Sequence, residues 1–130
     1  MYTNQLIHAI NIYSNAYLKV RKIESGETHH STNFGKARDI ANANKVMKNN
    51  YNKVLEFLSY KITIPKSAIV THSTLHETFG NEQEVELRHV PVYIAHIVHK
   101  DAIKANCKEV VDMFGALLRY FNAISYLPKQ

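Results

Sequence analysis

The chain has 130 residues, 45% of them apolar, and a formal net charge of +5. This size suits one domain spanning residues 1–130, and the apolar content is typical of a globular protein and excludes a disordered one. The longest apolar stretch covers about nine residues, against the roughly 20 needed to span a bilayer, and no signal peptide is apparent. The single cysteine indicates a reducing compartment, so we expect a cytoplasmic protein.

The first predicted helix runs from Thr3 to Ile23. Its apolar residues recur at steps of four and three, the spacing that places them on one helical face. They are Leu6, Ile10, Tyr13, Tyr17 and Val20. Thr3 is a candidate N-cap, and Ser25-Gly26 is a candidate stop signal.

A polar linker at 26–35 leads to a second predicted helix, from Lys36 to Tyr60, with Asn33 or Thr32 as its cap. The apolar face comprises Ile40, Met47, Tyr51, Val54 and Leu58. Three alanines near the start, Ala37, Ala41 and Ala43, would let a neighbouring helix approach closely. The linker is long enough for the two helices to be antiparallel.

The last predicted helix runs from Asp101 to Tyr126. Its apolar residues again alternate in steps of four and three: Ile103, Cys107, Val110, Phe114, Leu117, Phe121 and Ile124. This pattern predicts that Cys107 is an inert, buried thiol. Together the three segments predict a mainly α fold, an antiparallel bundle of three long amphipathic helices.

The central segment, residues 61–100, is irregular in pattern and leaves alternatives open. Residues 61–64 and 84–87 alternate in the manner of strands, which would suit a small β-hairpin, and a capping-box spacing predicts a short helix at 75–79. Residues 90–98 suit an edge strand, or else Pro91 begins a helix of about 35 residues. We favour a break near Lys100, with Asp101 as the N-cap of the last helix.

Basic residues are concentrated in the first half of the chain. Residues 1–66 hold ten Lys/Arg and four Asp/Glu, whereas residues 67–130 hold six and seven. The candidate contacts to nucleic acid or to an acidic protein lie on the first two helices: Lys19, Arg21, Lys22, Arg38, Lys45, Lys48 and Lys53. The alternative is that these side chains only solvate the outer helical faces.

Histidines suggest a metal site as an alternative function. His72 and His76 are four residues apart, so on a helix they would share one face, and His96 could complete a zinc or iron site. In fragment, these residues resemble ligand helices of hemerythrin-like proteins, but that family's His-x-x-x-Glu pair has no counterpart here. We therefore infer no membership, and expect no cofactor unless this histidine site forms.

A second alternative comes from two copies of His-x-Thr, at 30–32 and 72–74. Such pairs resemble the motifs of two-histidine phosphoesterases. The resemblance implies one imidazole as base, the other as acid, and hydroxyl groups that hold a nucleotide phosphate.

The preferred interpretation is a non-enzymatic, small helical binding or regulatory module. Its apolar faces are broader than three helices require among themselves, which predicts self-association, most simply as a homodimer. The basic face of the first two helices would then contact a protein or nucleic-acid partner.

Overall fold

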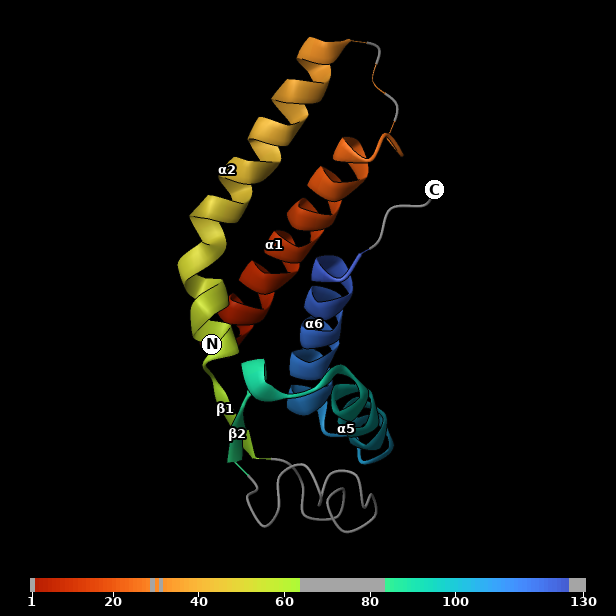
Figure 1. Cartoon of the computed structure of the whole chain (residues 1–130). Coiled ribbons are helices and arrows are strands. Elements are labelled where there is room, and N and C mark those ends of the chain that lie inside the picture. Colours follow the sequence, from red (N-terminus) through yellow and green to blue (C-terminus); the bar gives the residue numbers. More distant parts are fainter. Residues whose placement is uncertain (1, 29, 31, 64–83, 127–130) are drawn as a thin grey trace.

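The structure, a computed structural model, describes residues 2–28, 30, 32–63 and 84–126 (Figure 1). Its α-helices are α1 (Tyr2–Glu24), α2 (Asn33–Leu58), α5 (Val92–Lys104) and α6 (Lys108–Ile124). The shorter elements are β1 (Lys61–Thr63), β2 (Glu84–Glu86) and the 3-10 helix η1 (Leu87–His89). The mainly α prediction is confirmed, but the described residues form four α-helices, so a bundle of three long ones does not describe them. No helix among these residues is long and apolar enough to cross a bilayer.

Helices α1 and α2 form a long antiparallel hairpin, and α6 packs on the other side of α1 (Figure 1). Small side chains let the two hairpin helices approach each other closely. Ala16 and Val20 of α1 and Ala43 of α2 are buried together in one cluster between them. Helix α5 packs on α6 near the lower end of the hairpin in Figure 1, and the β1–β2 pair lies at the same end, below α2. The middle helix of the α2–α1–α6 layer is therefore α1.

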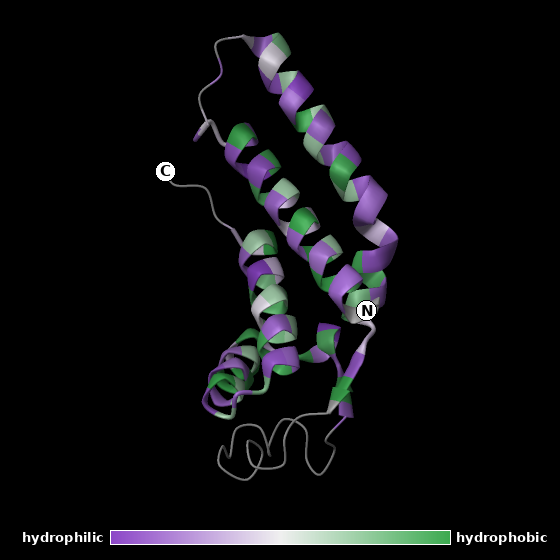
Figure 2. Ribbon diagram, turned by 180° about the vertical axis from the view of Figure 1, so that it is seen from behind, coloured by the Kyte–Doolittle hydropathy of each residue, from purple (hydrophilic) through white to green (hydrophobic). Residues whose placement is uncertain are grey.

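The main core lies where the lower half of the hairpin meets α5 and α6. Every helix contributes fully buried side chains to it: Leu6, Ile10, Phe57, Leu87, Ile94, Val98, Phe114 and Leu117. In Figure 2 the apolar residues of each helix recur along one side of the ribbon, as the sequence periodicity predicts. The upper part of the hairpin is packed around a smaller cluster, which comprises Ala16, Val20 and Ala43.

The ends of the hairpin helices follow local signals in the sequence. Gly26 adopts a positive φ of 80° after α1, and its neighbour Glu27 donates its N–H to the Lys22 carbonyl at 3.0 Å, which forms a Schellman turn. The predicted stop at Ser25-Gly26 is therefore confirmed, whereas Thr3 is no N-cap because α1 already begins at Tyr2. Thr32 caps α2, since its Oγ1 accepts the Gly35 N–H at 3.0 Å.

The break before the last helix lies at residues 105–107, where neither prediction placed it. Asn106 adopts a φ of 55°, and the Cys107 N–H bonds the Ala102 carbonyl at 3.0 Å, a second Schellman turn with Asn in place of Gly. Pro91 does begin a helix, but a short one, and the predicted N-cap Asp101 lies inside it. Cys107 is the half-buried N-cap residue of α6, so the prediction of a buried thiol was wrong.

Two of the predicted strands are confirmed in part. Strands β1 and β2 pair antiparallel, with Ile62 opposite Val85 and Thr63 opposite Glu84. Residues 92–98 are helical, so the alternative of an edge strand at 90–98 was wrong. The short helix predicted at 75–79 lies outside the described residues.

Candidate nucleic-acid interface

One long side of α2 is exposed and basic. Arg38 and Lys45 are seven residues apart, so they share a helical face and lie about 10 Å apart along the axis. The cations of this basic face and the asparagines between them are exposed: Arg38, Asn42, Lys45, Lys48, Asn49, Asn52 and Lys53. The nearby polar residues Asp39 and Asn50 are half-buried. The opposite side of the helix holds the buried Ala43, Val54 and Phe57 that face α1 and the core. The predicted cations of the second helix therefore belong to one surface.

The three predicted cations of α1 lie at its C-terminal end, level with the start of α2, but they do not act as a group. Lys19 is exposed and close enough to Asp39 of α2 to affect the pKa of that carboxyl. The Nζ atom of Lys22 instead lies 5.8 Å from the centre of the Tyr126 ring, beyond α6. Arg21 is half-buried. The structure thus places only Lys19 beside the basic face of α2.

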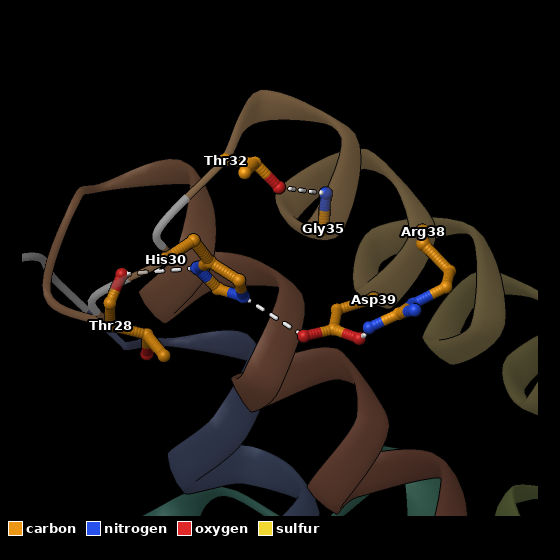
Figure 3. A network of polar contacts seen from close by, with 6 residues as sticks. All are labelled: Thr28, His30, Thr32, Gly35, Arg38 and Asp39. Carbon is orange, nitrogen blue, oxygen red and sulfur yellow. Dashed lines mark hydrogen bonds and ion pairs between the residues drawn. The ribbon is translucent and has the colours of Figure 1, made fainter.

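His30, in the loop between α1 and α2, forms a hydrogen bond to α2 next to this face. The Nε2 atom of His30 lies 2.9 Å from Oδ2 of Asp39, and its Nδ1 lies 3.3 Å from the carbonyl oxygen of Thr28 (Figure 3). Both partners are acceptors, so the ring can donate to both only as an imidazolium. The other Asp39 oxygen is 3.9 Å from Nε of Arg38. Asp39 is therefore the acceptor that holds the loop against the first turns of α2.

The pKa of the Asp39 carboxyl lies below its ordinary value of 3.8. The main cause is the hydrogen bond from His30, and the charges of Lys19 and Arg38 act in the same direction, against a smaller opposing effect of burial. A lowered pKa means that the unfolded chain takes up the proton first as the pH falls. The Asp39 carboxylate therefore stabilises the folded chain fully above pH 3.8, the ordinary pKa of the group. This stabilisation is lost as the pH falls through the lower pKa that Asp39 has in the folded chain.

We expect Asp39→Asn to reduce the free energy of unfolding at neutral pH, and the difference from the wild type to shrink below about pH 4. Urea titrations at several pH values would measure it. The control is Asp112→Asn, at an exposed carboxyl on α6. A difference between the wild type and Asp39→Asn that stays constant from neutral pH to about pH 2 would contradict this role.

Sequence reasoning missed a cluster of four tyrosines, which we call the tyrosine cluster: Tyr13 and Tyr17 of α1, Tyr51 of α2 and Tyr120 of α6. The ring centres of Tyr13 and Tyr17 are 6.5 Å apart, and those of Tyr13 and Tyr120 are 6.3 Å apart. Burial raises the pKa of Tyr13 and of Tyr120, and the nearby phenol of Tyr51 raises both further. The sequence placed three of these residues on apolar faces, where core packing was expected. Their meeting with Tyr120 depends on how α6 packs, which no local pattern encodes.

The proposed metal ligands are only partly within the structure. His96 is exposed on α5 and lines a hollow of about 210 Å³ between α5 and α6, together with Val92, Leu118, Phe121, Asn122 and Ser125. His72 and His76 lie outside the described residues. Within the part that is described, no three His, Cys, Asp or Glu side chains are grouped so as to hold a metal ion. A zinc or iron site therefore gains no support from the described residues.

The first His-x-Thr copy has structural roles in the described structure. His30 bonds Asp39, and Thr32 caps α2, so neither side chain is directed at an open site. Ser31 and the whole second copy, at 72–74, lie outside the described residues. The roles of His30 and Thr32 give no support to a phosphoesterase.

Comparison with known proteins adds no further assignment. No protein-family model, no curated protein and no solved structure matches the chain. Function must therefore be inferred from the residues and contacts of this chain alone.

Proposed function

We propose that the chain is a non-enzymatic, self-associating helical module that binds nucleic acid through the basic face of α2. The supporting observation is the charge of that face. From residue 40 to residue 55 the helix carries Lys45, Lys48 and Lys53 and no acidic residue. Asp39, which precedes this stretch, is bonded to His30. A ligand along α2 would therefore meet positive charge over about four helical turns.

The chemistry of this face suits phosphates better than a folded acidic protein. Its cations are spaced along one helix and are separated by asparagines, whose amide groups also donate hydrogen bonds to phosphate oxygens. Three of the four cations are lysines, which act as point charges, so we expect contacts to the backbone and little base readout.

Self-association would strengthen such weak, charge-based binding. Helix α5 leaves Val92 and Ile103 about half exposed, and these residues are three turns apart on one face. A second copy packed on this face would place two basic faces on one particle. Two linked sites bind a long polyanion more tightly than one.

The proposal is tested by reversing two charges. Lys45→Glu/Lys48→Glu should weaken binding to a fluorescein-labelled oligonucleotide by roughly tenfold or more at low salt. It should also reduce the slope of log K against log salt by about two, because two phosphate contacts are lost. Fluorescence anisotropy over several salt concentrations measures both quantities, and light scattering gives the number of chains in the complex.

The matched control is Lys104→Glu/Lys108→Glu, which makes the same change of charge at two exposed lysines of α5 and α6. Binding of the control should stay close to that of the wild type. The proposal fails if the wild type shows no salt-dependent binding, or if both double variants lose affinity equally.

A further inference from the structure

The tyrosine cluster is a half-open aromatic surface beside the basic face. Tyr51 is 47% exposed, and Tyr13, Tyr17 and Tyr120 are partly buried. Among the described residues none of the four hydroxyls makes a hydrogen bond, and no buried side-chain polar atom lacks a partner. The hydroxyls of the three partly buried tyrosines therefore reach solvent, as does exposed Tyr51. A tyrosine that served core packing alone would usually bury its ring and bond its hydroxyl.

Cations border this aromatic surface on two helices. Lys48 is three residues before Tyr51 on α2, and Arg21 is four residues after Tyr17 on α1. Residues at these spacings are neighbours on a helix surface. Lys48 also belongs to the basic face, so the aromatic and the cationic surfaces meet along one edge of α2. Positive charge next to partly exposed aromatic rings complements a ligand with anionic groups and flat, apolar ones.

We propose that the tyrosine cluster stacks the bases of a single-stranded nucleic acid whose phosphates lie along Lys45 and Lys48. This inference rests on the function proposed above and narrows its ligand. Single-strand binders combine a cationic path for the backbone with aromatic rings, and every base offers a face on which such a ring can stack. The bases of a duplex are already stacked on one another, so a duplex could use only the basic face. Tyr51, the most exposed ring of the four, makes the main contact.

The test compares two ligands and three variants. The ligands are a thymidine oligonucleotide of roughly 15 nucleotides and its duplex with the complementary strand. Tyr51→Ala should weaken binding of the single strand by about 5- to 100-fold and leave the duplex unchanged, whereas Tyr51→Phe should retain most of the affinity because it keeps the ring. Tyr93→Ala, at a similarly exposed tyrosine on α5, is the control and should bind like the wild type.

Intrinsic tyrosine fluorescence reports directly on whether bases stack on the tyrosine rings. The chain has eight tyrosines and no tryptophan, so its emission comes from tyrosine alone. Titration with the single strand should quench this emission in the wild type and quench it less in Tyr51→Ala. Circular dichroism of each variant shows whether the helices are retained.

The possible failures are distinguishable. Equal affinity for single strand and duplex, or no effect of Tyr51→Ala, overturns the stacking surface and leaves the basic face standing if the lysine reversal still weakens binding. Absence of all oligonucleotide binding overturns both proposals. Binding of polyglutamate without binding of either oligonucleotide would assign the basic face to an acidic protein and also overturn both.

Discussion

Phe57→Ala should lower the free energy of unfolding by about 3–5 kcal/mol. Phe57 is fully buried in the main core, where α2 meets α1 and η1. Its removal takes away a whole ring and leaves a cavity that the surrounding helices can fill only in part. Loss on this scale is a large share of the total stability expected for a domain of this size. Urea unfolding followed by circular dichroism measures the change.

The matched control is Leu55→Ala, two residues away on the same helix. Leu55 is 46% exposed, so its truncation should cost less than about 1 kcal/mol. Equal losses in the two variants would show that α2 is rotated about its axis relative to the orientation described here.

Ala43→Leu should destabilise the chain by about 1–3 kcal/mol, for the opposite reason. Ala43 is buried with Ala16 and Val20, where the upper parts of α1 and α2 approach each other. The added atoms would have to push the two helices apart or take strained rotamers. This part of the hairpin has only a small cluster of its own, so the change should also increase amide hydrogen exchange there.

Ala41→Leu is the control for this substitution, because Ala41 lies two residues earlier on the exposed side of α2. It should change the free energy of unfolding by less than about 0.5 kcal/mol. If both variants are equally stable, the close approach of the two helices is not set by Ala43.

Much of the helical content could be read from the sequence, because periodicity reports directly on which residues share a face. It identified Leu6, Ile10 and Val20 as buried residues of α1. It failed within α2, where it assigned Tyr51 to the apolar face and omitted Phe57. The structure exposes the first and buries the second. The buried side of α2, which comprises Ala43, Val54 and Phe57, is set by how the helix packs on its neighbours, and no local pattern encodes that packing.

The break before α6 shows a second limit of pattern reading. Apolar spacing continues from Ile103 through Val110 as though the helix were continuous, but Asn106 takes a left-handed conformation between them. One residue with positive φ ends a helix without disturbing the spacing around it. Asparagine occurs often enough at other positions that its presence alone did not predict this turn.

The candidate site was predictable only in its charged half. Arg38, Lys45, Lys48 and Lys53 lie on a single helix, so their common surface follows from the sequence. The tyrosine cluster and the bond from His30 to Asp39 join residues of different elements. Tyr13 and Tyr120 come together only because α6 returns along α1. Contacts of this kind depend on the three-dimensional packing of the chain.

The pairing of β1 with β2 brings together the two points at which residues 64–83 join the described part of the chain. Thr63 and Glu84 face each other across the two strands, so the twenty residues between them leave the framework and rejoin it at neighbouring points. Because the ends of the two strands are already paired, a tight turn could join them directly. His72, His76 and the second His-x-Thr copy all belong to residues 64–83. Comparing the chain with one shortened in this way would separate the roles of those residues from the role of the basic face on α2.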